Sequence, residues 1–315
     1  MTTAFLFPGQ GSQAVGMGAD LAERFPEAQA RFDEADAVLG FSLTDAMFGR
    51  GADADEAAER LKQTEITQPA LYVHSLAAAA VLDARGVRPG MAAGHSLGEY
   101  SALAACGACS FADGLRIVRT RGLLMARAGD GRPGTMAAVL GLDDDVVERV
   151  CAEASDGGEG VVVAANYNAP GQVVISGDPA AIDRAVEGAK AAGARRALPL
   201  PVSGAFHSPL MEEARAELGV ALEAVDWQRP RCPVYLNVTA QPTTDPAEIR
   251  ARLLEQLTAP VRWSQTLQAM QAGGAERFVE VGTGAVLSGL VKRTLGRGVA
   301  TDQAGTADAM GTLGA

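Results

Sequence analysis

The sequence predicts an α/β protein whose sheet is covered by helices on both faces and whose chain includes a small inserted domain. Short apolar runs such as Thr3–Phe7 alternate with helical patterns over the first hundred residues, which is typical of buried parallel strands. A serine flanked by glycines, Ser96, directly follows another such run. Residues 132–204 instead follow the order β-α-β-β-α-β, which indicates a ferredoxin-like domain. We therefore predict one discontinuous domain, residues 1–131 and 205–315, and one insertion.

Length and charge narrow the class of protein. A chain of 315 residues can bury one large core with a smaller one beside it. No apolar run approaches the roughly 20 residues that cross a bilayer, so we expect no membrane partner. The first residues, MTTAFLFPGQ, lack the basic segment of a signal peptide, and we expect a cytoplasmic protein. The net charge of −11 argues against a nucleic-acid partner, which would require a basic surface.

The first third of the chain supplies strands and helices in turn. The strand Thr3–Phe7 ends at Pro8, and a loop rich in glycine and amides follows it. A second apolar run, Met91–Ala93, fits the strand that leads to Ser96. Helical periodicity predicts three helices, of which the last two are closed by glycines: Ala19–Phe25, Glu27–Leu39 before Gly40, and Pro69–Ala84 before Gly86.

The insertion begins after the turn residues 131–134. Its strands are bounded by glycine and proline, and its helices open on acidic residues or proline. The predicted elements are strands at Thr135–Leu140, Val161–Asn166, Gln172–Ser176 and Ala194–Leu200, and helices at Asp143–Ala154 and 177–192.

The large domain resumes after the insertion. Ser208 is the expected N-cap of a helix that runs from Pro209 to about Ala224. From Gly296 onward the chain is rich in glycine, alanine and threonine. We therefore expect the last fifteen or so residues to be poorly ordered.

The segment Gly94-His95-Ser96-Leu97-Gly98 predicts a nucleophile elbow, a serine on a tight turn between a strand and a helix. The two glycines allow a sharp bend that leaves the hydroxyl group exposed. Leu97–Ala105 contains good helix formers, so Ser96 would lie at a helix N-terminus that favours a developing negative charge. The alternative is an ordinary strand-to-helix turn of small residues.

Serine needs a base, and histidine is the usual one. The chain has three histidines. His74 lies within an apolar helical pattern and fits a structural role, whereas His95 is expected to point away from the neighbouring Ser96. His207 lies in a loop before a predicted helix, which is a common location for a catalytic group, although an ordinary loop histidine is the alternative. We expect His207 to be the base, oriented by a backbone carbonyl or by a distant carboxylate.

The helical segment Asp113–Ala128 has one arginine on its apolar face. At about 100° per residue, Arg121 falls within the stripe formed by Leu115, Val118, Gly122 and Met125. A guanidinium group directed inward needs an anionic partner. That partner is either an internal carboxylate or the carboxylate of a substrate. The arginines outside the stripe are expected to be solvated: Arg116, Arg119 and Arg127.

The four cysteines suggest no disulfide framework. Cys106 and Cys109 have CxxC spacing, but no second CxxC or ligand-rich cluster completes a metal site. We predict that both are buried structural residues, with redox chemistry as the alternative.

Seven motifs in fixed order resemble the malonyl-CoA:acyl-carrier-protein transacylase family. The resemblance covers residues 3–295, nearly the whole chain. Two positions depart from the family pattern, since Thr283 stands where proline is common and Ala259 where a polar residue often occurs. The motifs are FPGQGSQ (7–13), GHSLGEYSAL (94–103), VRTRG (118–122), NYNAPGQVVISG (166–177), GAFH (204–207), QLTAPVRW (256–263) and EVGTG (280–284).

The resemblance implies an α/β-hydrolase-like core with an inserted ferredoxin-like domain. It implies that Ser96 is acylated, that His207 is the base and that Arg121 binds the malonyl carboxylate. The remaining implied roles are an oxyanion hole of backbone N–H groups from Gln10 and Leu97, orientation of the histidine by the carbonyl of Gln256, and substrate contacts from Asn166, Asn168, Gln172 and Phe206.

The implied reaction is a ping-pong transfer of malonyl from malonyl-CoA to the phosphopantetheine thiol of an acyl carrier protein. It needs neither a metal nor a bound cofactor. Fatty acid synthesis is the expected pathway, and trans-acting malonyl transfer for polyketide synthesis is the alternative. Phe206 lies in GAFH, which looks like the malonyl-type HAFH motif of polyketide acyltransferases. A serine thioesterase or esterase, or a non-catalytic carrier-binding module, would be the other classes.

Overall fold

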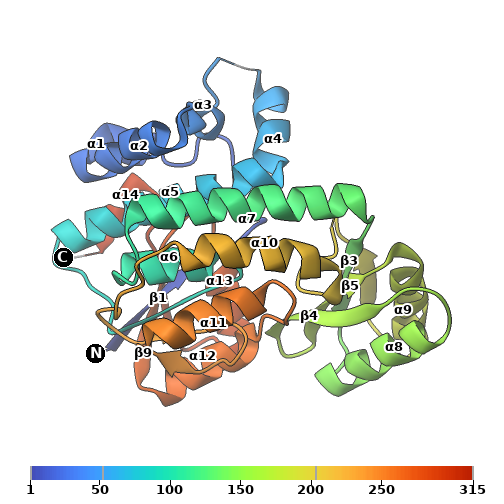
Figure 1. The fold of residues 1–315 in the computed structure, drawn as a ribbon. Coiled ribbons are helices and arrows are strands. Elements are labelled where there is room, and N and C mark those ends of the chain that lie inside the picture. Colours follow the sequence, from blue (N-terminus) through green and yellow to red (C-terminus); the bar gives the residue numbers. More distant parts are fainter. Residues whose placement is uncertain (1, 52, 203, 314–315) are drawn as a thin grey trace.

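The computed structural model describes residues 2–51, 53–202 and 204–313 (Figure 1). Its largest sheet has six strands in the order β10-β9-β1-β2-β7-β8. Neighbouring strands are parallel except for β7 and β8, which are antiparallel. The strands are β1 (Thr2–Phe7), β2 (Met91–Gly94), β7 (Val234–Tyr235), β8 (Pro242–Thr243), β9 (Ala275–Glu280) and β10 (Ala300–Gln303).

Helices pack on both faces of this sheet. Alternate residues of β1 enter different cores: Phe5 and Phe7 join one apolar cluster, and Ala4 and Leu6 join another. The first cluster takes residues from α2 (Pro26–Leu39), α5 (Thr64–Ala84), α6 (Leu97–Ala105), α7 (Phe111–Gly131), α10 (Glu212–Glu223) and α11 (Pro246–Gln256), and the second from α12 (Trp263–Ala272) and α13 (Val286–Leu295).

In the described residues, no helix is both long and apolar enough to span a membrane.

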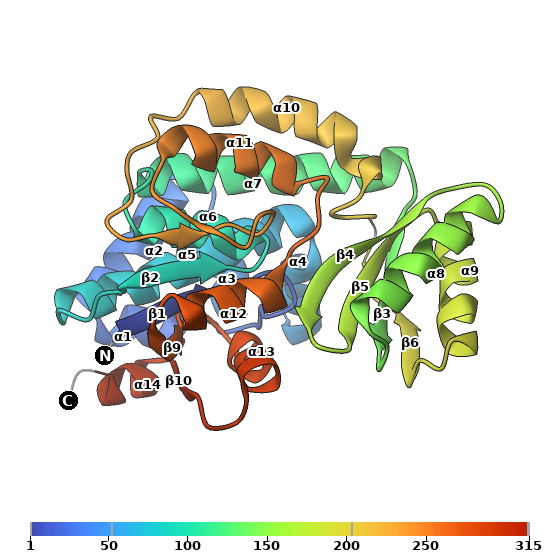
Figure 2. The ribbon, with the colours of Figure 1, turned by 90° about the horizontal axis from the view of Figure 1, so that it is seen from below.

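A second sheet lies to one side of the first, with its own two helices packed against it (Figure 2). Its order is β4-β5-β3-β6, and all neighbouring strands are antiparallel. This arrangement confirms the predicted fold class, a parallel-sheet core with a ferredoxin-like insertion. The boundaries at residues 132 and 204 stay a prediction. The elements are β3 (Thr135–Leu140), α8 (Asp144–Asp156), β4 (Val162–Ala169), β5 (Gln172–Gly177), α9 (Pro179–Ala191) and β6 (Arg196–Pro199).

The prediction of a poorly ordered C-terminus is wrong as far as residue 313. Residues 300–303 form the edge strand β10, and α14 (Ala307–Thr312) packs back with Met310 fully buried. Thr306 caps this helix, and the Asp20 carboxylate accepts a hydrogen bond from the Ala307 N–H. Composition suggested disorder, but strand pairing and capping stabilise the segment.

The predicted start of the third helix is also wrong, because α5 begins at Thr64 and contains Pro69. Proline cannot donate to the carbonyl group four residues earlier, that of Glu65. The guanidinium group of Arg119 donates to this carbonyl instead. The short helix α1 (Ala19–Arg24) corresponds to the predicted helix Ala19–Phe25. Three further short elements were not predicted: α3 (Leu43–Phe48), α4 (Ala54–Lys62) and the 3₁₀ turn Pro209–Met211 before α10.

Candidate active site

Ser96 occupies the sharp turn between β2 and α6, as the elbow prediction requires. Its backbone has φ 50° and ψ −107°, which is unusual for a residue with a side chain. The two flanking glycines are in close contact, since a Cβ atom on Gly94 would lie 1.9 Å from the carbonyl oxygen of Gly98. Larger residues at these positions would therefore open the turn.

The side chain of His207 lies beside the nucleophile. Its Nε2 atom is 2.7 Å from Ser96 Oγ, and its Nδ1 atom is 2.9 Å from the carbonyl oxygen of Gln256. Because a carbonyl group only accepts, Nδ1 carries the hydrogen and Nε2 is free to accept the serine proton. A backbone carbonyl thus orients the base, which is the arrangement implied for Gln256.

The electrostatic surroundings keep His207 neutral. Burial lowers its pKa to about 3, with a further lowering by the positive charge of Arg121 and a small one by His95, against the raising effect of the Gln256 carbonyl. The imidazole is therefore an acceptor throughout the physiological pH range.

Arg121 is almost fully buried, at 1 % exposure, and points at the same serine. Its NH2 atom donates to Ser96 Oγ at 3.0 Å and to Gln256 Oε1 at 3.2 Å, and its NH1 atom donates to Gln68 Oε1 at 2.8 Å. These three acceptors are all neutral, and Nε has no partner among the described residues. The guanidinium group therefore has donors and charge to offer an anionic ligand.

The helical wheel placed most arginines of α7 correctly. Arg121 lies inside with the predicted apolar stripe, whereas Arg116 and Arg127 are exposed and form ion pairs with Asp113 and Glu217. The expectation of a solvated Arg119 is wrong, because its half-buried side chain serves the carbonyl group that Pro69 leaves without a donor.

One of the two residues implied for the oxyanion hole lies at the elbow. Leu97 is the first residue of α6. The loop after β1 packs against the same turn, since a Cβ atom on Gly98 would lie 2.0 Å from the Phe7 carbonyl oxygen and 3.0 Å from that of Pro8. Gln10 follows in this loop, and its side-chain Nε2 donates to Thr64 Oγ1 at 3.5 Å. The use of the Gln10 and Leu97 N–H groups as an oxyanion hole stays a prediction.

One of the two asparagines predicted as substrate contacts, Asn168 of the small sheet, binds a residue of the elbow. Asn168 Oδ1 lies 2.7 Å from Nε2 of His95, whose ring also packs edge-on against Trp263. His95 thus turns away from Ser96, as expected. Asn166 pairs through its backbone with Val261, which joins β4 to the large domain.

Two further predicted substrate contacts, Gln172 and Phe206, have other neighbours in the structure. The Gln172 side chain accepts a hydrogen bond from Arg293 of α13. It has no hydrogen bond to Ser96, His207 or Arg121. Phe206 is buried in the main core cluster directly before the base. Its role in narrowing the acyl pocket stays a prediction.

Three buried polar residues around the site had no role predicted from the sequence. Gln68 holds Arg121, Asn237 accepts a hydrogen bond from the Ser96 N–H, and Glu99 binds the backbone of Asn237. Burial raises the pKa of Glu99 to about 8, so this carboxyl group is mostly protonated at pH 7. Of these three residues, Glu99 could have been found from the sequence, because it follows Ser96 by three residues within the motif GHSLGEYSAL.

The remaining histidine and cysteines lie apart from the site. His74 is fully buried in α5, and burial lowers its pKa to about 4. Cys106 and Cys109 are both buried, as predicted, but the close neighbour of Cys106 is Cys232, with a distance of 3.4 Å between the sulfur atoms.

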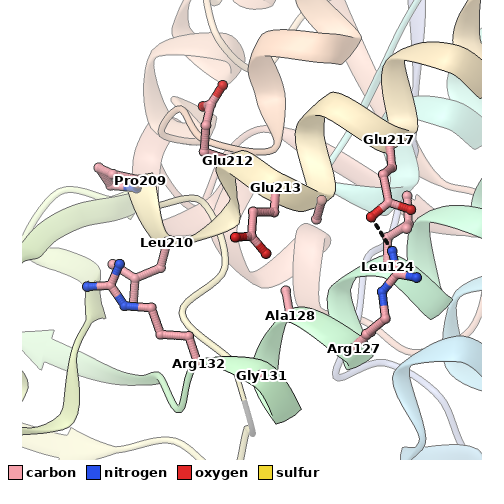
Figure 3. A pocket seen from close by; sticks show the side chains of 11 residues that line it. Leu124, Arg127, Ala128, Gly131, Arg132, Pro209, Leu210, Glu212, Glu213 and Glu217 are labelled. Carbon is pink, nitrogen blue, oxygen red and sulfur yellow. Dashed lines mark hydrogen bonds and ion pairs between the residues drawn. The ribbon is translucent and has the colours of Figure 1, made fainter.

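A separate cavity of about 420 Å³ lies between α7 and α10 (Figure 3). An ion pair between Arg127 and Glu217 links the two helices at this cavity. Pro209 and Leu210, which line it, directly follow the loop of His207. None of the predicted site residues lines this cavity, so it is not the acyl site.

Comparisons with known proteins agree on one family. The model of the acyl transferase domain family matches residues 4–313. The malonyl CoA-acyl carrier protein transacylase of Bacillus subtilis (strain 168) is 46% identical over 92% of this chain and 89% of its own. An acyl carrier protein S-malonyltransferase structure from Vibrio cholerae has a TM-score of 0.92 at 41% identity, covering 99% of this chain and 100% of that chain. A malonyl-transacylase in complex with a type II PKS acyl-carrier protein has a TM-score of 0.92 at 39% identity, covering 99% of both chains.

Proposed function

This chain belongs to the malonyl-CoA:acyl-carrier-protein transacylase family, and we propose that it transfers malonyl groups from malonyl-CoA to the phosphopantetheine thiol of an acyl carrier protein. One observation carries the proposal: Ser96 Oγ lies 2.7 Å from His207 Nε2 and 3.0 Å from Arg121 NH2. A nucleophile, its base and a cationic donor thus meet at one atom, from three segments far apart in the chain.

The first half-reaction acylates the serine. His207 Nε2 takes the hydroxyl proton while Ser96 Oγ attacks the thioester carbonyl of malonyl-CoA. The N–H groups of Gln10 and Leu97 hold the oxyanion, and one such donor is typically worth roughly 3–4 kcal/mol. The tetrahedral intermediate collapses, the C–S bond breaks, and His207 returns its proton to the CoA thiolate.

The second half-reaction repeats these steps with a different thiol. The phosphopantetheine thiol of the carrier protein gives its proton to His207 and attacks the malonyl ester. Ser96 leaves as an alkoxide and regains the proton. The CoA thioester and the partner's pantetheine arm supply all the reacting groups, so the scheme uses no bound cofactor or metal.

Arg121 selects acyl groups that carry a carboxylate. In the free protein its guanidinium group spends its hydrogen bonds on Ser96, Gln256 and Gln68. A malonyl carboxylate would take over donors from these neutral groups and pair with the buried charge. This exchange also releases Ser96 Oγ from the guanidinium group when the correct substrate arrives.

An acidic carrier protein requires a basic surface on an enzyme of net charge −11. The C-terminal part of α13 and the segment after it offer one, because Lys292, Arg293 and Arg297 line a surface pocket of about 560 Å³. Arg293 also binds Gln172 of β5, so these basic residues lie beside the small sheet. We assign the docking of the carrier protein to this surface.

The expected cytoplasmic location of the protein stays a prediction.

Intact mass spectrometry tests the function directly. Brief incubation of the parent with malonyl-CoA should add one malonyl group, and Ser96→Ala should show no adduct. Addition of a phosphopantetheinylated carrier protein should then remove the group from the enzyme and add it to the carrier. An unmodified parent after incubation with malonyl-CoA would exclude the proposal.

Two alternatives, a role in polyketide synthesis and a thioesterase activity, can be distinguished from the proposed function by experiment. The similarity to a transacylase bound to a type II PKS acyl-carrier protein makes polyketide synthesis the alternative pathway to fatty acid synthesis. The rates of malonyl transfer to a fatty acid carrier protein and to a polyketide carrier protein distinguish the two pathways. A thioesterase would use the same dyad but has no need of a buried, uncompensated Arg121. Rapid CoA release over many turnovers without a carrier protein would favour hydrolysis.

A further inference from the structure

The backbone of Ser96 needs support from its surroundings. Its φ of 50° and ψ of −107° lie where residues with side chains are seldom stable unless neighbouring groups hold them. The carbonyl group of Ser96 accepts hydrogen bonds from Gln256 Nε2 at 3.1 Å and from the Glu99 N–H at 3.1 Å. The N–H group of Ser96 is held by a different residue, Asn237.

The side-chain amide of Asn237 binds the two peptide groups on either side of His95. Its Oδ1 atom accepts from the Ser96 N–H at 2.7 Å, and its Nδ2 atom donates to the Gly94 carbonyl at 2.6 Å. Asn237 follows β7 by two residues, and β7 is the strand that pairs with β2. The side chain therefore extends the sheet's hydrogen bonding into the turn, where the strand pair has ended.

Asn237 is itself fixed by two backbone contacts. Its N–H donates to Glu99 Oε2 at 2.6 Å, and its carbonyl oxygen accepts from the Arg262 N–H at 2.9 Å. Asn237 and Glu99 are both fully buried. Because Glu99 lies in the first turn of α6, the contacts close a ring from the helix start through Asn237 to Ser96.

We propose that Asn237 is a positioning residue for Ser96 and that the buried carboxyl group of Glu99 fixes Asn237 in place. This inference rests on the proposed function. The ring sets the direction of the Ser96 hydroxyl group and of the next N–H, that of Leu97, which belongs to the oxyanion hole. Loss of the ring displaces both groups by a fraction of an ångström to an ångström, and displacements of this size can cost about 100-fold in rate. Malonyl binding changes little, because Arg121 comes from α7 and is held by Gln68.

The test measures the two effects separately. Quenched-flow mass spectrometry gives the single-turnover rate of Ser96 malonylation and the malonyl-CoA concentration at half-maximal rate. Asn237→Ala should slow the maximal rate tenfold or more while the half-saturating concentration stays within threefold. Asp36→Ala is the matched control, since the Asp36 side chain also accepts from two backbone N–H groups, those of Leu43 and Thr44, but is not part of the site. It should leave the rate unchanged.

Substitutions at Glu99 provide a second test that does not alter Asn237. Glu99→Gln keeps an oxygen to accept from the Asn237 N–H and should retain the parent rate within threefold, whereas Glu99→Ala should slow it tenfold or more. Should Asn237→Ala fail to fold, this pair decides. The proposal is overturned if Asn237→Ala slows malonylation less than tenfold, if its half-saturating concentration rises in step, if Asp36→Ala is equally slow, or if Glu99→Gln and Glu99→Ala behave alike. A parent that forms no malonyl adduct refutes the proposed function instead.

Discussion

Replacing Arg121 with alanine probes the acyl preference of the site. The side chain is 1 % exposed, and its hydrogen-bond acceptors Gln68, Ser96 and Gln256 are all neutral. Truncating one partner of a buried, hydrogen-bonded charge pair costs about 2–5 kcal/mol. The rate of Ser96 malonylation should therefore fall about 30- to 5,000-fold. An acetyl group has no carboxylate and does not need the guanidinium group of Arg121. The rate of Ser96 acetylation should therefore stay the same or increase.

The assay compares initial rates of Ser96 acylation with malonyl-CoA and with acetyl-CoA for three proteins. Arg116→Ala serves as the control beside Arg121→Ala, because Arg116 lies on the same helix but is exposed and paired with Asp113 at 3.1 Å. It should leave both rates unchanged. Parallel losses with malonyl-CoA and acetyl-CoA in Arg121→Ala would show that the arginine supports the fold or the nucleophile and does not read the carboxylate.

The same variant has a predicted pH signature. Burial is the main cause of the low pKa of His207, and the positive charge of Arg121 is the next. Removing that charge raises the pKa of the imidazole. Since His207 acts in its neutral form, activity is lost as the pH falls through this pKa, and the acid limb of acetyl transfer should move to higher pH in Arg121→Ala. An acid limb at unchanged or lower pH would contradict the electrostatic account.

Three further predictions concern other residues. The parent should prefer malonyl-CoA over methylmalonyl-CoA by about 10- to 200-fold, and Phe206→Ala should reduce this preference; equal rates in the parent would contradict the pocket assignment. Lys292→Glu should raise the half-saturating concentration of carrier protein, whereas the matched change Lys62→Glu on exposed α4 should not, as steady-state kinetics with carrier in variable amount can show. Burial lowers the pKa of His74 to about 4 from 6.5, so the unfolded chain binds a proton that the folded chain excludes, and the free energy of unfolding should fall by about 3 kcal/mol as the pH drops from above 6.5 to 4. Urea titrations of His74→Asn should show a smaller fall, and an equal fall in both proteins would refute this account.

Local patterns were sufficient to predict the small sheet and the strands and main helices of the first part of the chain. Apolar runs and glycine-closed helices marked β1, β2 and the small sheet, because buried strands and capped helices leave signals within a few residues. The strands β7 to β10 and the helices α11 to α14 were not predicted. Two wrong predictions about the fold arose from tertiary contacts. Pro69 resembled a helix start, yet the helix continues through it because Arg119 supplies the missing donor to Glu65. The segment after Gly296 looked disordered, yet β9 offers it an edge for pairing.

The site shows the same division between local and long-range information. Ser96, His207 and Arg121 each had a local signature: an elbow, a helix-preceding loop and an inward helical position. Gln68 was hidden because the helix was started one residue after it. Asn237 had no local signature at all, since its contact with Ser96 depends on the pairing of β2 with β7, strands more than a hundred residues apart in the chain.

The charges of the site suggest that its specificity is mainly electrostatic. At pH 7 His207 is neutral, with a pKa of about 3, and Glu99 is mostly protonated, with a pKa of about 8. Arg121 is then the one ionised group of the three, and it is buried among neutral acceptors. Such a site carries a net positive charge that an acyl carboxylate neutralises and an acetyl group does not. An internal carboxylate partner for Arg121 would have stabilised the fold but removed this discrimination. The costly burial of an unpaired guanidinium group is therefore best explained by the substrate that completes it.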